Sequence, residues 1–287
     1  MRTPSKNTKA RLTATAATAA LAVGLTACGT ASDPQSAGSG TQDGPLTVAA
    51  SATPHAEILE YVRDHLAEEE GLELNVKVFN DYVLPNTATE SGDVDANYFQ
   101  HQPYLDDFNA KNGTHIVPVT TVHLEPLGLY AKDARSLDDL TPGQTIALPN
   151  DTTNGGRALR LLDANGVIEL KDGAGQDATL ADIADPRGLK FQELEAATLP
   201  RALGEVDAAV INGNYAIEAD LKPAEDALAL EEADGNPYAN FLAVKEGDED
   251  DPRVATLARL LNSEQVRSFI KDEYDGSVLP ASGGTTV

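Results

Sequence analysis

The residues best suited to bind a charged ligand form one run, Pro149 to Arg157, with the sequence PNDTTNGGR. The run follows an apolar segment and precedes leucines at helical spacing, so it is expected to join a strand to a helix. The first backbone N–H groups of a helix favour an anion, and Arg157, about one turn in, offers a guanidinium for a bidentate contact with a carboxylate. The alternative is an ordinary capped helix with a surface arginine. The run lacks the Gly-Lys-Ser/Thr of a nucleotide-binding loop.

Two further clusters combine aromatic rings with amides. The first joins Phe79-Asn80-Asp81-Tyr82 to Asn97-Tyr98-Phe99-Gln100-His101, and the second joins Asn212, Asn214 and Tyr215 to the segment 236–240, NPYAN. A mostly apolar pocket with a few polar groups is typical of a small-molecule site. Amides both donate and accept, which suits a ligand with an ammonium and a carboxylate. The alternatives are core packing for the rings and turn or capping roles for the asparagines.

No set of residues indicates catalysis or a cofactor. The sequence has no Gly-x-Ser-x-Gly elbow and no His-Glu-x-x-His pair, and its five histidines are scattered. Carboxylates are abundant, but in so acidic a chain abundance identifies no acid–base pair. A single cysteine excludes a disulfide framework and a cysteine-based metal site. We therefore predict a protein that is not an enzyme and needs neither a cofactor nor a metal.

Periodicity predicts the elements that hold these residues. Strands are expected at 46–50, 74–78, 144–148, 189–194, 208–211 and 241–244, and helices at 58–70, 154–165, 199–203, 252–261 and from 262 or 263 onward. Gly71 and Gly166 are the predicted helix stops, and Asp251-Pro252 is a predicted N-cap followed by proline at the first helical position. The alternation of strands and helices indicates an α/β fold with parallel strands. Leu84-Pro85 before GDVDA (92–96) and Leu199-Pro200 before GEVDA (204–208) suggest two lobes built on one plan.

The N-terminus predicts the compartment. Four cations and no acid precede an apolar run that ends at Cys28, the pattern of a bacterial secretory signal (1–27) with a lipid-modifiable cysteine. The run is too short and too weakly apolar for a comfortable membrane span. Residues 28–45 are small and polar and predict a flexible, lipid-anchored linker. The chain has a net charge of −25 and loses its four signal cations on cleavage, which argues against nucleic acid as a partner.

The sequence resembles the NlpA-type lipoproteins, the methionine-binding subunits of methionine ABC importers. Matching segments run in order over about 46–280, nearly the whole expected folded body. The segments are FNDYVLPNTA (79–88), GDVDANYFQHQPYLDDF (92–108), VPVTTVHLEPLGLY (117–130), ALPNDTTNGGRALRLL (147–162), ELEAATLPRAL (193–203), VDAAVIN (206–212) and NPYANFLAVK (236–245).

The resemblance implies a periplasmic-binding-protein fold of two α/β lobes joined by two crossing segments. We expect the first lobe to comprise 46–128 and 236–281 and the second lobe 129–235. The ligand would lie between them. By position, Arg157 would hold the ligand carboxylate, and Asn212 and Asn240 the rest of the amino acid head group. Tyr82, Phe99 and His101 would enclose the thioether.

The resulting hypothesis is an extracytoplasmic lipoprotein, palmitoylated and anchored to the cell membrane at Cys28. It would capture L-methionine, D-methionine or a methionine-containing dipeptide and deliver it to an ABC importer permease with its cytoplasmic ATPase. The lipid is the only expected attachment to the membrane. The alternatives are a two-lobed extracytoplasmic enzyme acting on amino-acid derivatives and a metal-capturing lipoprotein.

Overall fold

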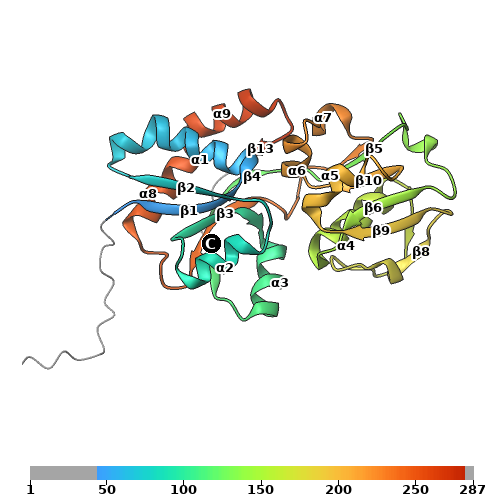
Figure 1. Ribbon diagram of the computed structural model, residues 1–287, viewed down its shortest axis with the longest axis horizontal. Coiled ribbons are helices and arrows are strands. Elements are labelled where there is room, and N and C mark those ends of the chain that lie inside the picture. Colours follow the sequence, from blue (N-terminus) through green and yellow to red (C-terminus); the bar gives the residue numbers. More distant parts are fainter. Residues whose placement is uncertain (1–43, 282–287) are drawn as a thin grey trace, which may run out of the picture. The chain divides into compact units, whose positions relative to one another are not determined.

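A computed structural model describes residues 44–281, so the predicted signal peptide, the lipidation site at Cys28 and nearly all of the predicted linker lie outside the described residues. The first of two large mixed sheets has six strands in the order β13-β4-β12-β3-β1-β2 (Figure 1). Its strands are β1 Leu46–Ser51, β2 Leu74–Phe79, β3 Ala96–His101, β4 Ile116–Leu124, β12 Asn240–Lys245 and β13 Leu279–Pro280. β1 runs parallel to both β2 and β3, as the strand–helix–strand pattern predicted, whereas β12 is antiparallel to β3 and β4.

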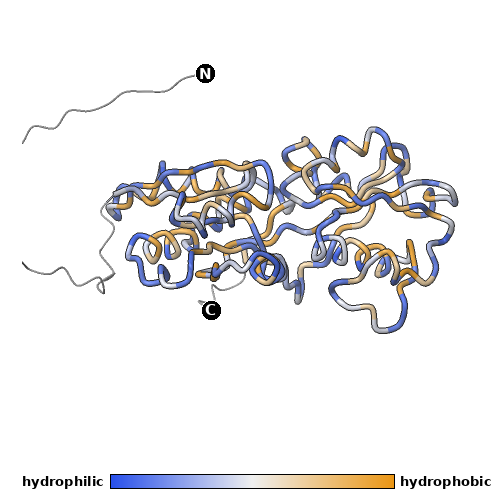
Figure 2. Tube along the Cα trace, turned by 60° about the horizontal axis from the view of Figure 1, so that its bottom comes forward, coloured by the Kyte–Doolittle hydropathy of each residue, from blue (hydrophilic) through white to orange (hydrophobic). Residues whose placement is uncertain are grey.

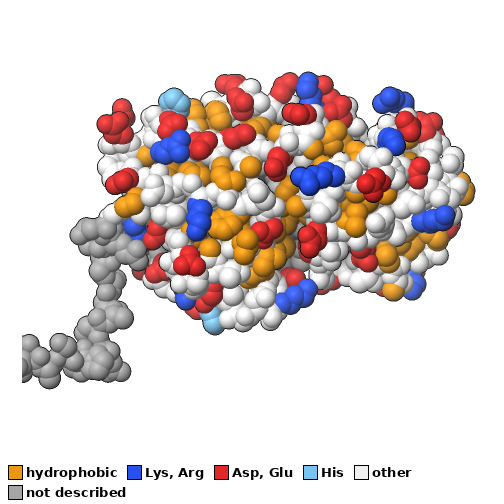
Figure 3. Space-filling model, viewed as in Figure 1, with side chains coloured by type: hydrophobic (Ala, Val, Ile, Leu, Met, Phe, Trp, Pro, Cys, Tyr) orange, Lys and Arg blue, Asp and Glu red, His pale blue; other side chains and the backbone are white. Residues whose placement is uncertain are grey.

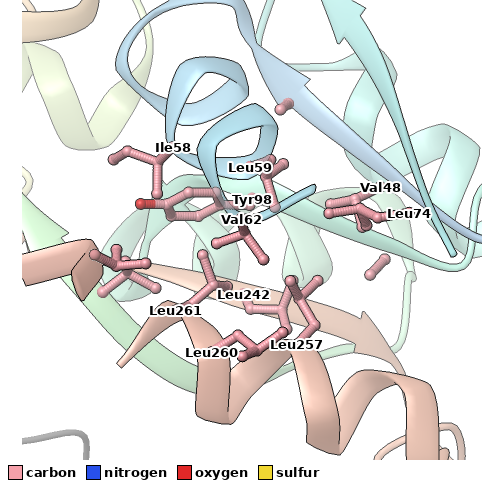
Figure 4. Packing of buried hydrophobic residues seen from close by; sticks show 14 of the residues in the cluster. Val48, Ile58, Leu59, Val62, Leu74, Tyr98, Leu242, Leu257, Leu260 and Leu261 are labelled. Carbon is pink, nitrogen blue, oxygen red and sulfur yellow. The ribbon is translucent and has the colours of Figure 1, made fainter. Parts of the chain in front are cut away.

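Helices cover both faces of this sheet. The helices are α1 Glu57–Val62, α2 Leu84–Ser91, α3 Gln102–Asn112, α8 Pro252–Leu261 and α9 Glu264–Tyr274. Alternate strand residues divide between the faces, because successive side chains of a strand point to opposite sides. Val48 and Leu242 join the core beneath α1, α8 and α9, whereas Ala49 and Phe241 pack on the side of α2 and α3. Figure 4 shows Leu242 and Leu257 facing the α1 side chains in this core.

The second sheet has five strands in the order β11-β5-β10-β6-β9. Its strands are β5 Gly128–Ala131, β6 Thr145–Pro149, β9 Lys190–Leu194, β10 Ala208–Ile211 and β11 Ala229–Leu230. Its helices are α4 Thr152–Ala164, α5 Leu199–Ala202, α6 Gly213–Glu218 and α7 Pro223–Asp226, and a small hairpin is formed by β7 Glu169–Leu170 and β8 Ile183–Asp185. α4 packs on one face through Leu159 and Leu162, and α5 and α6 pack on the other through Leu199 and Ala216. The α/β fold with two lobes is confirmed.

The two similar sequence segments, GDVDA (92–96) and GEVDA (204–208), belong to a structural unit that occurs in both sheets. In the first sheet β1 pairs with β2 and β3, and in the second sheet β6 pairs in the same parallel sense with β9 and β10. Asp95 accepts a hydrogen bond from the backbone N–H of Thr47 at 2.7 Å, and Asp207 does the same for Thr145 at 2.8 Å. Each acid thus fixes the start of the neighbouring strand in its own sheet.

The predicted helix signals are confirmed, with shifts at some ends. Gly71 and Gly166 both have the left-handed backbone that ends a helix without a steric penalty. Asp251 caps α8, and the following helix restarts at Ser263, whose hydroxyl accepts from Val266 N at 3.3 Å. The helix expected from Asn154 begins at Thr152, because Asp151 caps it. The first predicted helix is irregular after Val62 and continues as a π-helical turn η2 (Arg63–Ala67) and a 3-10 turn η3 (Glu68–Glu70).

Charge and hydropathy follow this architecture. Figure 2 shows the hydrophobic stretches concentrated along the central strands, with hydrophilic residues on outer turns and helix faces. Figure 3 shows acidic side chains scattered over the visible face and outnumbering the basic ones. The whole sequence has 46 acidic and 21 basic residues. Such a surface favours solubility of the body and repels polyanions.

The core beneath α8 provides a test of the fold. Leu257 is fully buried, so Leu257→Ala should lower the free energy of unfolding by about 2–5 kcal/mol through lost burial and the cavity that remains. Leu84→Ala is the control, because Leu84 is 51% exposed and its loss should cost under about 0.5 kcal/mol. The chain has no tryptophan, so urea unfolding is best followed by far-UV circular dichroism. Equal midpoints for the two variants would contradict the packing.

Candidate functional site

The six residues predicted to bind a ligand surround one small cavity formed by segments of both sheets. The cavity is lined by Tyr82, Phe99, Gln100, His101, Tyr104, Glu125, Asn154, Arg157, Asn212, Gly213, Asn214 and Asn240. The centre of a water molecule can occupy only about 20 Å³ of it. Side chains of the two sheets therefore contact one another across the space, and a larger ligand requires them to separate.

The ends of strands place these side chains. His101 is the last residue of β3 and Asn212 follows β10, both of which run parallel to a neighbour, and Arg157 lies in α4 after β6. Ligands of open α/β sheets bind at the carboxyl ends of such strands. Asn240 begins β12 and lies opposite His101 of β3 and His123 of β4. The register of three strands thus brings residues distant in sequence to one edge.

Arg157 is buried, only 4% exposed, so the alternative of a surface arginine is wrong. Its Nε donates to Glu231 Oε1 at 2.9 Å, and its Nη2 donates both to Glu231 Oε2 and to the backbone carbonyl of Glu125, the latter at 3.0 Å. The guanidinium also lies 4.1 Å from the ring centroid of Tyr238. The edge of the guanidinium formed by Nε and Nη2, which could have made a bidentate contact with a ligand carboxylate, is therefore occupied by Glu231. Within residues 44–281 Nη1 makes no hydrogen bond and remains available.

Glu231 is the internal counter-charge of Arg157. Burial acts to raise the pKa of this carboxyl, but the charge and hydrogen bonds of Arg157 outweigh burial and hold the pKa below its usual range. The backbone N–H of Leu127 also donates to Glu231 Oε2 at 3.2 Å. Arg157 and Glu231 form a buried ion pair, which is costly to break because a lone buried charge would remain.

A chain of amides connects the two sheets. His101 Nδ1 accepts from the backbone N–H of Tyr104 at 3.2 Å, so His101 carries its proton on Nε2 and donates to Asn154 Oδ1, also at 3.2 Å. Asn212 Nδ2 donates to the same oxygen at 3.0 Å. Burial and the nearby Arg157 lower the pKa of His101 to about 3, so this ring is neutral at physiological pH. Asn212 Oδ1 is buried and has no partner in the described part of the chain, so it can accept from a ligand.

Aromatic rings form one wall of the cavity. Tyr82, from the loop after β2, lies with its ring centroid 5.9 Å from that of Phe99 and 5.1 Å from that of Tyr215. Its hydroxyl donates to Asn214 Oδ1 at 2.5 Å. Phe99 and Tyr104 are nearly buried, and they pack with Phe108. The rings thus belong to a packed cluster and also line the cavity. Core packing and pocket lining, the two interpretations of this sequence cluster, therefore both apply.

A buried acid, Glu125, lies in the cavity wall and was not predicted. It follows β4 directly and is 6% exposed. His123 Nε2 lies 2.7 Å and His55 Nε2 lies 3.2 Å from its Oε1. The hydroxyl of Tyr98 contacts His123 Nδ1, and Asn240 Oδ1 lies 3.2 Å from His55 Nε2. The acid is therefore part of a buried network that extends beneath the ligand cavity.

His55, His123 and Glu125 have the side chains of a metal site, and their ligand atoms lie within 4.8 Å of one another. Hydrogen bonds nevertheless account for this arrangement. The separation of 2.7 Å between His123 Nε2 and Glu125 Oε1 is that of a direct hydrogen bond, and each histidine nitrogen that faces Glu125 acts as its donor. His101, another buried histidine of the cavity wall, is hydrogen-bonded to Asn154 and not to this group. Among residues 44–281 no other group of this kind is close enough to hold a metal.

Sequence signals for the missed residues were weak. His123 and Glu125 stand two apart around the end of a strand, so they face the same side, a spacing that points to the pair. Glu231 and Tyr238 lie on an irregular segment between β11 and β12 and give no periodic signal. His55 lies in an irregular turn, η1 (Ala52–Ala56), and meets Glu125 only through the fold.

In the part of the chain covered by the structure, no helix combines the length and the apolar character that a membrane crossing requires. A family model described as NlpA lipoprotein matches residues 46–282. The methionine-binding lipoprotein MetQ of Bacillus subtilis (strain 168) is 43% identical over 242 residues, which cover 83% of this chain and 88% of that protein.

Solved structures agree in fold. A nutrient binding protein from Burkholderia cenocepacia, bound to methionine, is 47% identical with a TM-score of 0.80, over 83% of this chain and all of that chain. A periplasmic substrate-binding protein of an ABC transporter from Coxiella burnetii is 42% identical with a TM-score of 0.78, over 82% of this chain and 100% of that chain. The expected two-lobed binding-protein fold is confirmed. With nearly the whole described body matched, the chain belongs to the NlpA lipoprotein family.

Proposed function

We propose that this protein captures methionine outside the cytoplasm and delivers it to an ABC importer, whose permease is driven by a cytoplasmic ATPase. One observation carries the proposal: a guanidinium nitrogen, an unpartnered amide oxygen and a wall of aromatic rings meet in one buried cavity. Relatives that bind methionine or serve ABC transporters support it. The protein acts as a binding module and not as an enzyme.

The head group of the ligand lies between Arg157 and the amides. The free Nη1 of Arg157 donates to the carboxylate, while Glu231 holds the other edge of the guanidinium in place. Asn212 and Asn240, both 6% exposed, provide amide groups from opposite sheets. Because amides both donate and accept, they suit the carboxylate and the ammonium of one zwitterion.

The side chain of the ligand lies against Tyr82, Phe99 and His101. Burial keeps His101 neutral, so a thioether that packs against this ring does not have to strip water from a charge. Sulfur packs well at the edges of aromatic rings. The present cavity is too small for methionine, so the rings must move apart during entry and close again around the ligand.

Ligand capture couples to closure of two lobes, 46–128 with 236–281 and 129–235. The chain passes from the first sheet to the second after β4 and returns after β11, which provides two hinge segments, 125–127 and 231–239. Tyr82 donates to Asn214, and Lys111 Nζ donates to Thr152 Oγ1 at 2.6 Å, between groups on opposite lobes. A ligand that bridges both lobes shifts the equilibrium toward a closed arrangement that keeps such contacts while the cavity widens to hold the ligand.

The N-terminal segment supplies the attachment to the membrane. Cleavage after residue 27 leaves Cys28 as the new N-terminus, where lipid holds the protein at the extracytoplasmic face of the cell membrane. The linker that follows, through residue 45, allows the body to reach the permease. Named relatives that are lipoproteins support this placement.

Arg157 provides the direct test of the binding mode. Arg157→Ala should weaken methionine binding by roughly 30- to 1,000-fold, because a buried charged contact to the carboxylate is lost. Arg160→Ala on the exposed side of the same helix should bind within about twofold of the wild type. Isothermal titration calorimetry measures both affinities.

Loss of Arg157 also leaves Glu231 buried without its partner, so misfolding must be separated from lost binding. The double variant Arg157→Ala/Glu231→Gln removes both charges and should recover stability but not affinity. Near-native binding by a folded double variant would contradict the proposal.

The tyrosine hydroxyl between the lobes provides a second test. Tyr82→Phe keeps the ring but removes the 2.5 Å hydrogen bond to Asn214, so it should weaken methionine binding by roughly 2- to 10-fold. Phe108→Leu, in the same aromatic cluster but not in the cavity lining, should change affinity by less than about twofold. Small-angle scattering should show a larger share of open molecules for Tyr82→Phe at subsaturating methionine, and unchanged affinity would contradict closure through this contact.

A further inference from the structure

We infer that Glu125 is the acceptor for the α-ammonium of the ligand and that His55 and His123 are the positioning residues that hold this carboxylate toward the cavity. The inference rests on the proposed function, since it assigns the amine end of the same ligand. It predicts a ligand class: amino acids with a free α-amine.

Glu125 has the location that this role requires. It lines the cavity together with Arg157 and Asn212, and its own backbone carbonyl accepts from Arg157 Nη2 at 3.0 Å. A Cβ added at Gly213 would lie 2.8 Å from Glu125 Cβ and 3.2 Å from Oε2. Glycine at position 213 therefore allows the start of α6 to approach the carboxyl group. The backbone N–H of Asn214 also donates to this carboxyl.

The hydrogen bonds determine the protonation states. His55 Nε2 faces two acceptors, Glu125 Oε1 and Asn240 Oδ1, each at 3.2 Å, so it carries a proton. With Glu125 ionised, His123 Nε2 carries the proton and donates to Glu125 Oε1 at 2.7 Å, and His123 Nδ1 accepts from the Tyr98 hydroxyl. Two neutral histidines thus donate to one oxygen of an ionised carboxylate. Burial lowers the pKa of His55 to about 4 and that of His123 to about 3, which agrees with neutral rings.

Glu125 lacks a full counter-charge in this network. Burial raises the pKa of its carboxyl, and this effect outweighs the opposing influence of His55, Arg157 and the Asn214 N–H. Arg157 is already paired with Glu231 through its side chain. The titratable and charged groups facing Glu125 are His55 from η1, His123 from β4, Tyr98 from β3, Arg157 from α4, Tyr82 from the loop after β2 and Tyr215 from α6. None of these groups provides a full counter-charge for the Glu125 carboxylate, whereas the ammonium of a ligand would.

The arrangement selects for the amine. A free α-ammonium supplies the positive charge that the buried carboxylate lacks, and the unpartnered Asn212 Oδ1 accepts a second of its protons. An acylated nitrogen carries no charge and would leave Glu125 buried without compensation. The site therefore accepts free methionine and rejects peptides in which methionine is the second residue.

The same charge balance predicts how affinity depends on pH. The raised pKa of Glu125 in the free protein falls when the ammonium binds, because the positive charge favours the ionised form. Affinity is full above the raised pKa and weakens as pH falls through it, and binding then releases a proton. His55 and His123 stay neutral above about pH 5, so the loss in that range belongs to Glu125.

The first experiment compares ligands by calorimetry at neutral pH. Wild-type protein should bind methionine at least roughly 30-fold more tightly than N-acetylmethionine or glycylmethionine. Glu125→Gln preserves shape but removes the charge, so it should weaken methionine by a similar factor and leave N-acetylmethionine nearly unchanged. Equal preference for methionine in wild type and Glu125→Gln would overturn the inference.

The second experiment tests the positioning residues through pH profiles from 5 to 8. His123→Leu removes a donor to Glu125, so the loss of methionine affinity should begin about one pH unit higher than in the wild type. His123→Gln retains an N–H donor and should restore the wild-type profile. His115→Gln, at an exposed histidine, is the matched control. A purely structural role for His123 would lower stability in both variants without moving the profile.

The outcomes separate this inference from the proposed function. If the wild type binds no form of methionine, the proposed function fails. If it binds methionine but N-acetylmethionine binds equally well, or if the pH profiles of His123→Leu and His123→Gln coincide, only the assignment of Glu125 and its histidines fails. Circular dichroism of every variant verifies folding before titration.

Discussion

The site depends on one constraint: charges buried away from water must be compensated within the protein or by the ligand. Arg157 and Glu231 compensate each other through a two-point contact. Glu125, on the other side of Arg157, receives only neutral donors from His55 and His123. A zwitterion adds one negative charge near the free edge of Arg157 and one positive charge near Glu125. Its binding therefore leaves the net charge of the cavity unchanged while every buried charge gains an opposite neighbour. A simple anion would supply no positive charge to Glu125, and a simple cation would leave the free edge of Arg157 unused.

Sequence periodicity predicted those parts of the scaffold that obey local rules. The alternation at 74–78 and the apolar run at 46–50 correspond to β2 and β1, whose side chains pack against helices on both faces of one sheet. Gly71 and Gly166 end helices because only glycine takes a left-handed backbone without strain. The repeated Gly-x-Val-Asp-Ala segments predicted two similar halves, and Asp95 and Asp207 occupy equivalent places in them. The strand alternation and the helix-ending glycines depend on residues that are close in the chain, and the repeat is visible as a short sequence segment, whereas the contacts of Asp95 and Asp207 join distant residues.

The charge pairs of the site could not be predicted from the sequence, because their partners are far apart in the chain. Arg157 contacts Glu231 across 74 residues, and His55 contacts Asn240 across 185 residues. In a chain with 46 acids, nothing in the composition distinguishes Glu125 or Glu231 from solvated surface residues. Their importance comes from burial, which only the fold determines. The sequence clusters did single out Arg157, Asn212 and Tyr82, which line one cavity, because these residues follow predicted strands, where ligand sites of α/β proteins occur. Phe99 and His101 also line the cavity, but they lie in β3, a strand that the periodicity did not predict.

The positions of the two acids join ligand recognition to the hinge. Glu125 begins the first segment that connects the sheets, and Glu231 begins the second. These segments are hydrogen-bonded to each other, since Glu231 N donates to Leu127 O at 3.0 Å and Leu127 N donates to Glu231 Oε2 at 3.2 Å. Arg157 contacts both, through the carboxylate of Glu231 and the carbonyl of Glu125. A ligand carboxylate that pulls on Arg157 therefore acts on both connections at once. In the proposed binding mode, the charges that recognise the ligand lie at the two segments that connect the sheets, so charge compensation and lobe closure would be directly coupled.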